Sequence, residues 1–508
     1  MTQPSQTGFF GHPAGLRTLF FTEMWERFSY YGLRPLLVLF MSAALLDGGF
    51  GLDRGQASAI VGIYAASVYL ASLPGGWVAD RWLGLRRAIT AGAFLITFGH
   101  VSIGLSGMAG QGTAGKAFFF LGLILIVLGT GLLKPNISAI VGDLYPEGGA
   151  RRDAGFSIFY MGINVGAFLG QLVTGYLGEQ VSWHVGFGAA GVGMLMGLIS
   201  FKVFGPKTLG DLGNEIERHP DPQVQAARER TVKLVSFGVL AAIAAVFLMA
   251  LGGVFVPDPQ VIGRNMTAVL IGAAAVFFGY VFLFGGLDAN ERKRVLVILV
   301  LFIAAAIFWS AFEQAPTSLN LFARDFTDRM VGSFEIPATW FQSVNSFFII
   351  LLAPVFAWIW VGLAKGPGDL SSPAKFSLGL AFAGVGFALM IIAANKLGAP
   401  DGTALGPPMW LVGSYFFQTV GELCLSPVGL SSMTKLSPRK YLGQMMGIWF
   451  LATAVGNLIA GLVGGQVDPE NLQQTPALFT TTSISLFVAA VVLGLLIVPI
   501  RRMMGEKQ

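Results

Sequence analysis

Apolar runs of about 20 residues recur along the whole chain, separated by short polar segments. A helix of that length crosses a bilayer, so the pattern predicts an all-α polytopic membrane protein. Fourteen spans are expected, at 17–45, 56–80, 87–108, 117–142, 153–177, 183–205, 231–252, 264–287, 293–322, 338–363, 374–396, 407–434, 440–465 and 476–500.

Composition supports this fold class. The chain has 508 residues, of which 54% are hydrophobic and 12% are charged, whereas soluble domains average about 25% charged residues. The first 16 residues are polar and rich in Gly and Pro, so no cleavable signal peptide is expected. Cys424 is the only cysteine, so no disulfide holds a monomer together.

The net charge of +5 reflects topology and does not indicate a nucleic-acid partner. An even number of spans puts both termini on one side, and loops on that side hold 22 of the 32 Lys and Arg residues, against six on the other. This asymmetry predicts a multi-pass protein of the cell inner (plasma) membrane, with both termini in the cytoplasm. Nothing in the sequence requires an oligomer, so a monomer in the lipid bilayer is expected.

Segment 207–233 is the longest polar run and is interpreted as a linker. The two spans that follow are nearly free of charge and are expected to be peripheral, lipid-facing helices. The predicted organisation is an N-terminal six-helix bundle (1–207), a cytoplasmic linker with two inserted helices (208–290) and a C-terminal six-helix bundle (291–508).

The two bundles show a faint internal repeat. Pro135 and Pro427 are 292 residues apart, as are Pro146 and Pro438, and Gly166 lies 290 residues before Gly456. Related six-helix halves are expected of the major facilitator architecture, although chance similarity among small apolar residues is the alternative.

The repeat predicts how deep the charged residues of the two bundles lie in the membrane. It aligns Lys134 with Ser426, and Glu422 lies one helical turn from Ser426. Lys134 and Glu422 are therefore expected at similar depth, facing each other across a central cavity. By the same reasoning, Arg34 and Glu313 belong to the outer part of the membrane.

The first span carries four ionisable side chains: Glu23, Glu26, Arg27 and Arg34. Each costs roughly 2.5–3.5 kcal/mol at the bilayer centre, and on a helix all four share one stripe with Tyr30. Glu23 and Arg27 have the i, i+4 spacing of an ion pair. One pair does not need two carboxylates, so the surplus acid is a candidate proton carrier; a purely structural ion pair is the alternative.

Three further ionisable residues in the spans are equally strong candidates, and one histidine is a weaker one. Lys134 precedes Pro135, where a local helix break is expected, and Glu313 and Glu422 are lone carboxylates in apolar spans. His100 is interpreted as a packing residue, with proton transfer as the less favoured possibility.

The segment GGWVADRWLGLRR (75–87) is an inter-helix loop and lacks the end of a phosphate loop. Gly75 and Gly76 are expected to allow close helix approach. No zinc, haem or nucleotide signature is present, so no cofactor is expected, and no nucleophile–base pair indicates an enzyme.

Seven segments together resemble the proton-dependent oligopeptide transporter family, across residues 8 to 465. They are FTEMWERFSYYGLR, GGWVADRWLGLRR, GTGLLKPN, DAGFSIFYMGINVGAF, FWSAFEQ, WFQSVN and GELCLSPVGLS. The fourteen spans with a two-helix insert are similar to those of its bacterial members.

The resemblance implies residue roles. Glu23, Glu26 and Arg27 would couple proton movement to transport, with protons as the coupling ion. Arg27, Arg34 and Lys134 would hold the peptide carboxylate, and Asn164, Asn345 and Glu422 its amino group. Arg34–Glu313 and Lys134–Glu422 resemble gate salt bridges. The implied pocket residues are Tyr30, Tyr31, Tyr69, Tyr160, Trp309, Ser426 and Trp449, although aromatic residues in spans are more often packing groups.

The sequence departs from the family at two points. Animal members have a histidine on the second span, where residues 56–80 have none, and Ser346 follows Asn345 where relatives often have proline. The expected function is proton-coupled import of di- and tripeptides by alternating access. A symporter for nitrate or another small organic anion or drug-like solute is the main alternative, and a non-transporting peptide receptor is a remote one.

Overall fold

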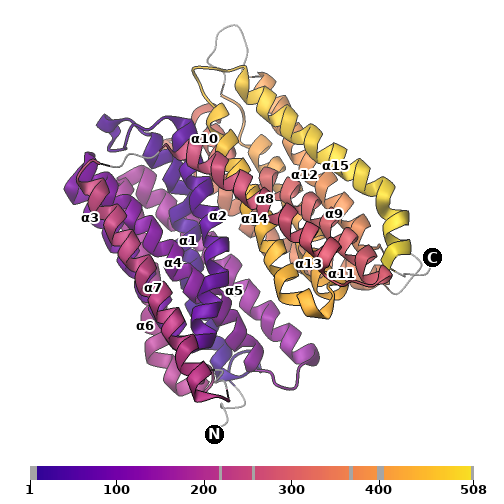
Figure 1. Ribbon diagram of the computed structural model, residues 1–508. Coiled ribbons are helices and arrows are strands. Elements are labelled where there is room, and N and C mark those ends of the chain that lie inside the picture. Colours follow the sequence, from indigo (N-terminus) through magenta and orange to yellow (C-terminus); the bar gives the residue numbers. More distant parts are fainter. Residues whose placement is uncertain (1–7, 217–219, 255–257, 365–369, 397–404, 505–508) are drawn as a thin grey trace. The chain divides into compact units, whose positions relative to one another are not determined.

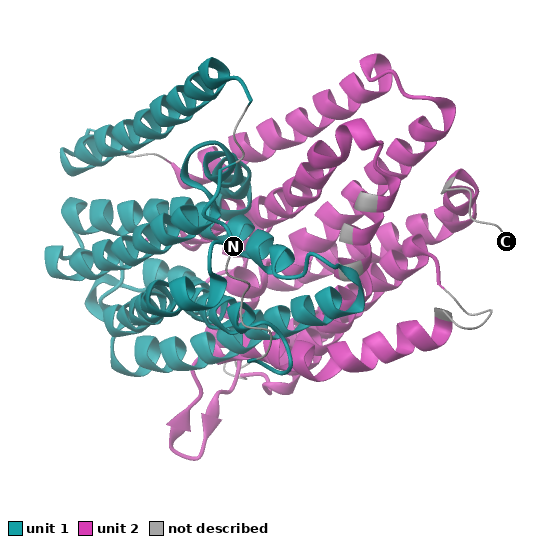
Figure 2. Cartoon of the chain, turned by 90° about the horizontal axis from the view of Figure 1, so that it is seen from below, with its two compact units in different colours: residues 1–51, 67–257 teal, residues 52–66, 258–508 magenta. Residues whose placement is uncertain are grey.

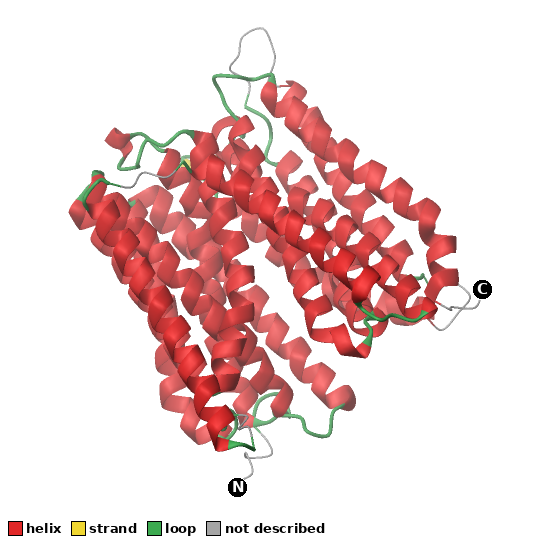
Figure 3. Cartoon of the chain, in the orientation of Figure 1, coloured by secondary structure: helices red, strands yellow, loops and turns green. Residues whose placement is uncertain are grey.

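The computed structural model describes residues 8–216, 220–254, 258–364, 370–396 and 405–504 and is almost entirely helical (Figures 1 and 3). Its long helices are α1 (Ala14–Ser42), α2 (Arg54–Val78), α3 (Leu85–Ala109), α4 (Thr113–Asp143), α5 (Gly149–Tyr176), α6 (Trp183–Leu209), α7 (Pro222–Leu251), α8 (Pro259–Phe284), α9 (Ala289–Phe312), α11 (Trp340–Ala364), α12 (Ser372–Lys396), α13 (Met409–Leu436), α14 (Leu442–Val463) and α15 (Gln474–Met504). Short elements are the helical turns η1 (Leu45–Asp47), η2 (Ala79–Leu83), η3 (Leu177–Val181), η4 (Ala315–Leu319), η5 (Arg439–Tyr441) and η6 (Gly464–Gln466), helix α10 (Asn320–Phe326), and the antiparallel strands β1 (Met330–Val331) and β2 (Phe334–Glu335), in which Met330 pairs with Glu335.

Each predicted span corresponds to one long helix, which confirms the all-α prediction. Twelve helices of the described chain are long and apolar enough to cross a membrane. Helices α1 and α13 are not among the twelve. Helix α1 is less apolar because it carries Glu23, Glu26, Arg27 and Arg34, which we call the charged stripe. Helix α13 is less apolar because it carries Ser414, Gln418, Thr419 and Glu422. Both of these helices carry ionisable candidate site residues in their membrane-spanning part.

The chain forms two compact units (Figure 2). Unit 1 comprises Met1–Gly51 and Ser67–Pro257, and unit 2 comprises Leu52–Ala66 and Asp258–Gln508. Helix α2 is therefore divided between the two units, since its first half belongs to unit 2 and its second half to unit 1. A Cβ on Gly62 would lie 2.7 Å from the Asn457 carbonyl oxygen, so this half of α2 packs closely on α14. The three-part organisation with an inserted helix pair stays a prediction.

Glycines on α5 hold α1 in place within unit 1. A Cβ on Gly166 would lie 2.1 Å from the Met24 carbonyl oxygen, and one on Gly170 would lie 2.4 Å from that of Phe28. The next turn continues this seam, because Thr174 Oγ1 donates a hydrogen bond to the Gly32 carbonyl at 2.8 Å. Small residues four apart let two helix backbones approach, and here they fix the helix that carries the charged stripe.

Glycine contacts between α3 and α4 recur between α12 and α13. In unit 1 a Cβ on Gly129 would lie 2.5 Å from the Gly92 carbonyl oxygen. In unit 2 a Cβ on Gly421 would lie 2.6 Å from that of Gly379. Gly421 follows Gly129 by 292 residues, which is the offset of the proline pairs. The repeat is therefore also present in the helix packing of each unit.

Two helix ends differ from the predicted spans. Helix α7 begins nine residues before the predicted position 231, because Asp221 caps it by accepting a hydrogen bond from the Gln223 N–H and Pro222 takes the first helical position. The predicted span 293–322 lies within one candidate span, Ala289–Phe326, but its helical geometry changes: α9 ends at Phe312, and the chain continues through η4, which begins at Ala315 beside Pro316. Proline lacks the N–H that the helix ladder needs, which accounts for the change of helical geometry there.

The expected helix break at Pro135 is absent, since α4 runs without interruption to Asp143. Pro135 cannot donate to the Gly131 carbonyl one turn earlier. That carbonyl oxygen would lie 2.0 Å from a Cβ on Gly75, so α2 approaches α4 at this point. Close approach was predicted for both Gly75 and Gly76, and it is wrong for Gly76, where a Cβ would meet open space.

Candidate functional site

The charged stripe on α1 is buried in unit 1. Arg27 Nε lies 3.0 Å from Glu23 Oε1 and 2.6 Å from Glu26 Oε2. Glu23 and Glu26 are each 1% exposed, and Arg27 is 2% exposed. The i, i+4 pair expected from the sequence is therefore present, with a second carboxylate on the same guanidinium. One buried cation faces two buried acids.

Helix α4 supplies the polar neighbours of Glu26. Thr130 Oγ1 donates a hydrogen bond to Glu26 Oε1 at 3.4 Å, and Lys134, one helical turn further on, is near enough to act on Glu26 electrostatically. The second carboxylate is thus balanced partly by a cation on another helix. Movement of α4 relative to α1 would change the charge balance around Glu26.

Tyrosines border the cations of unit 1. Arg27 Cζ lies 5.4 Å from the centroid of the Tyr30 ring and Arg34 Cζ lies 6.0 Å from it, while Tyr31 packs edge-on against Tyr30 at 5.1 Å. Lys134 Nζ lies 4.6 Å from the centroid of the Tyr69 ring. The negative face of an aromatic ring stabilises a cation where water is scarce. Tyr30, Tyr31 and Tyr69 therefore lie together with the predicted carboxylate-binding cations.

On α5, the predicted residues lie one helical turn apart. The side chain of Tyr160 is 45% exposed, whereas Asn164 is buried and its Nδ2 donates to the Tyr160 carbonyl of the same helix at 3.0 Å. The side-chain oxygen of Asn164, a hydrogen-bond acceptor, takes no part in that bond, and a ligand-binding role for Asn164 stays a prediction.

The charged and amide candidates of unit 2 lie at the end of α9 and on α11 and α13. Asn345 Nδ2 donates to Thr419 Oγ1 at 2.9 Å and is 3.3 Å from Glu422 Oε2. Glu313, directly after the end of α9, is buried and acts electrostatically on Glu422. This unit therefore presents two neighbouring carboxylates, with an amide that orients one of them.

Two tryptophans and a serine complete the predicted pocket residues of unit 2. Trp309 is buried between Phe308 and Phe312, with ring centroids 5.3 and 5.4 Å away. Trp449 is buried against Phe376 at 6.2 Å and lies beside Gly429, and Ser426 is half-buried on α13. These contacts also fit the packing interpretation, so a pocket role for Trp309, Trp449 and Ser426 stays a prediction.

The contacts of His100 fit the packing interpretation, which stays a prediction. His100 is buried, and its Nε2 shares a hydrogen bond of 2.6 Å with Ser29 Oγ, which connects α3 to α1.

Sequence reasoning missed three polar supports: Ser29, Thr130 and Thr419. Thr130 lies one helical turn before Lys134 and Thr419 lies nearly one turn before Glu422. That one-turn spacing is visible in the sequence and indicates a hydroxyl group beside each charged side chain. A search for hydroxyl side chains beside each buried charge would have found both threonines.

Each predicted gate pair has one member in each unit: Arg34 and Lys134 in unit 1, Glu313 and Glu422 in unit 2. Arg34–Glu313 and Lys134–Glu422 therefore stay predictions. Within the described ranges, no group of three or more His, Cys, Asp or Glu residues is arranged to hold a metal ion.

Comparison with known proteins identifies similar transporters. The model of the POT family matches residues 86–478. The chain is 48% identical to the peptide transporter YePEPT of Yersinia enterocolitica, over 99% of this chain and 98% of that protein. It is 36% identical to the di-/tripeptide transporter of Lactococcus lactis subsp. cremoris, over 98% of both.

Solved structures agree along the full length. A crystal structure of the peptide transporter POT in complex with sulfate has a TM-score of 0.88 and 42% identity, and covers 99% of this chain and 98% of its own. A POT family transporter in complex with 5-aminolevulinic acid has a TM-score of 0.86 and 33% identity, with 98% of this chain and 99% of its own covered.

Proposed function

This chain belongs to the POT family, a family of membrane transporters and not of enzymes, and on that premise we propose that it imports di- and tripeptides together with protons. The family assignment supports peptide transport, because relatives that match almost the entire chain are named peptide or di-/tripeptide transporters. The protein is a multi-pass membrane transporter. We place it in the cell inner membrane as a monomer with cytoplasmic termini, as its loop charges predict.

The observation that carries proton coupling is the contact of one buried guanidinium, Arg27, with two buried carboxylates. Ionised carboxylates in a dry site are costly unless each has a cation. Arg27 contacts both Glu23 and Glu26 but carries a single charge, so the surplus carboxylate is satisfied by a proton or, at Glu26, by the electrostatic influence of Lys134. A substrate carboxylate that attracts Lys134 away from Glu26 would favour protonation of Glu26. Proton and peptide binding would then reinforce each other.

Peptide recognition follows from the charges of the two units. Every dipeptide zwitterion has a carboxylate and an ammonium group at nearly constant separation, whatever its side chains. We assign the carboxylate to Arg27, Arg34 and Lys134, and the ammonium group to Glu422, Asn345 and Asn164. The pocket would be lined by the remaining predicted residues: Tyr30, Tyr31, Tyr69, Tyr160, Trp309, Ser426 and Trp449. The pairs Arg34–Glu313 and Lys134–Glu422 would act as gates in alternating access.

The test is uptake of dialanine into proteoliposomes with and without an inward proton gradient. We expect accumulation above equilibrium with the gradient and its collapse on addition of a protonophore. Equilibration without accumulation would refute coupling while retaining peptide transport. If nitrate competes for the transport site and dialanine does not, the anion symporter is favoured. Dialanine binding without any uptake would favour the receptor.

A further inference from the structure

Asn345 of α11 donates both hydrogens of its side-chain amide to α13. Its Nδ2 lies 2.9 Å from Thr419 Oγ1 and 3.3 Å from Glu422 Oε2. The amide oxygen of Asn345 takes no part in either bond, and neither does Glu422 Oε1. Both of these oxygens are hydrogen-bond acceptors. The two side chains therefore offer two acceptors to a group that carries several N–H donors, such as an ammonium ion.

The hydroxyl group of Thr419 determines which way the amide of Asn345 points. Thr419 is 0% exposed, and it donates its single O–H to the Tyr415 carbonyl of the same helix at 2.7 Å. Thr419 Oγ1 can therefore only accept from Asn345. If the amide were turned over, its oxygen would face this hydroxyl oxygen and an ionised Glu422, and neither has a hydrogen to offer. Both contacts favour the same orientation, and the bond to Thr419 is the shorter of the two.

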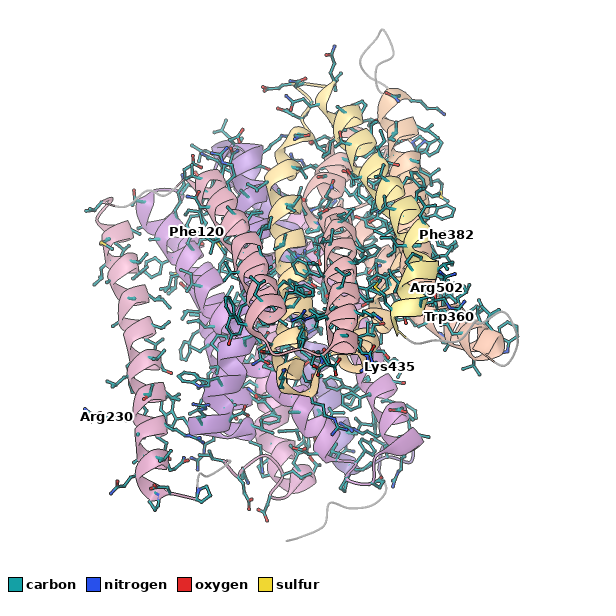
Figure 4. All side chains as sticks on the ribbon, turned by 45° about the vertical axis from the view of Figure 1, so that its right-hand side comes forward. Phe120, Arg230, Trp360, Phe382, Lys435 and Arg502 are labelled. Atoms are coloured by element: carbon teal, nitrogen blue, oxygen red, sulfur yellow. The ribbon has the colours of Figure 1, made fainter. Side chains whose placement is uncertain are left out.

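Helix packing holds the backbone on both sides of this contact. Ser346 keeps the N–H that a proline would lack, and α11 has no break at this point. About one helical turn away, Phe348 of α11 packs edge-on against Phe416 of α13, with ring centroids 5.2 Å apart. Phe382 of α12, which is labelled in Figure 4, stacks on Phe417 of α13 at 6.4 Å. Because the backbones are held in this way, the orientation of the amide depends on its own hydrogen bonds.

We propose that Thr419 is a positioning residue for the peptide amino group, and that it acts by fixing the amide of Asn345. This role rests on the proposed function, in which Asn345 and Glu422 hold that group. In the fixed orientation the Asn345 oxygen and Glu422 Oε1 both accept from the ammonium group, which has three N–H donors. With the amide turned over, an NH₂ group would face the ammonium and could not accept from it. Glu422 is engaged by the peptide, whereas the bond to Thr419 does not involve the peptide and keeps the amide oriented during binding.

Competition binding of dialanine and N-acetyl-dialanine to the full-length protein tests this role. Thr419→Val keeps the shape of the side chain but removes the acceptor, so dialanine should bind about fivefold more weakly. N-acetyl-dialanine has no ammonium group, and its affinity should change little. Thr419→Ser keeps the hydroxyl group and should retain the affinity of the wild type for dialanine. Thr267→Val is the matched control, because it removes a threonine O–H that donates to the Gly263 carbonyl of its own helix, α8, at 2.8 Å, and it should leave both affinities unchanged.

A double-mutant cycle separates positioning of the amide from general support of the fold. In an Asn345→Ala background, Thr419→Val should cause no further loss of dialanine affinity, because the amide that Thr419 orients is gone. The same loss in that background, or equal weakening of both peptides by Thr419→Val alone, would overturn the role of Thr419. Unchanged dialanine affinity in Thr419→Val, with normal binding by the wild type, would overturn it as well. Failure of the wild type to bind dialanine would refute the proposed function, and the role of Thr419 with it.

Discussion

Arg27 Nε lies 2.6 Å from Glu26 Oε2, and both side chains are at most 2% exposed. Such a pair is costly to break by removing one member, because the other is left buried and charged. The free energy of protonating Glu26 therefore depends on the positions of the nearby cations, including Lys134.

Glu26→Gln should abolish gradient-driven accumulation of dialanine while leaving exchange of peptide across the membrane. The amide keeps the shape of the side chain but cannot exchange a proton. Uptake and counterflow in the same proteoliposomes separate the two activities, with Thr130→Val as a control that removes only a hydrogen bond to Glu26. Normal accumulation by Glu26→Gln would exclude this residue as the proton carrier.

Glu422→Gln should weaken binding of dialanine by about 30-fold or more, since loss of one member of a buried charged pair costs roughly 2–5 kcal/mol. Binding of N-acetyl-dialanine, which has no ammonium group, should change little. Competition assays with the two peptides measure this difference. Equal weakening of both would mean that Glu422 supports the fold of the site and does not contact the amino group.

Gly166→Ala should destabilise the protein by about 1–3 kcal/mol through overpacking against α1. The added Cβ would lie 2.1 Å from the Met24 carbonyl oxygen, which cannot move without shifting the helix. Thermal unfolding in detergent provides the measurement. Gly188→Ala is the matched control, because a Cβ there meets nothing within 4 Å. Similar melting temperatures for the two variants would contradict close α1–α5 packing.

Asp288→Ala should lower the melting temperature at neutral pH, and the effect should shrink in acid. Asp288 caps α9, and hydrogen bonds from the Glu291 and Asn290 N–H groups lower its pKa. A lowered pKa in the folded state stabilises the protein above the ordinary pKa of aspartate, and the gain is lost as pH falls through the lowered value. Melting curves of both proteins between neutral and acidic pH test this, and a pH-independent difference would contradict it.

The helical membrane fold and most of the charged stripe on α1 follow directly from the amino-acid pattern. Apolar runs long enough to span a bilayer leave few alternatives to helices, because buried backbone groups need partners within the same segment. Helical periodicity alone placed Glu23, Glu26 and Arg27 on one stripe, and their proximity is a local consequence of that spacing.

Features that depend on which helices are neighbours could be found only from the three-dimensional packing. The contact of Thr130 with Glu26, the stacking of Lys134 on Tyr69 and the hydrogen bond of Asn345 to Thr419 all join different helices. The same holds for the uninterrupted α4 at Pro135, where Gly75 approaches the carbonyl that proline leaves without its helical partner. Packing between helices depends on side-chain volume and backbone approach over long sequence separations, which the pattern along one chain does not contain.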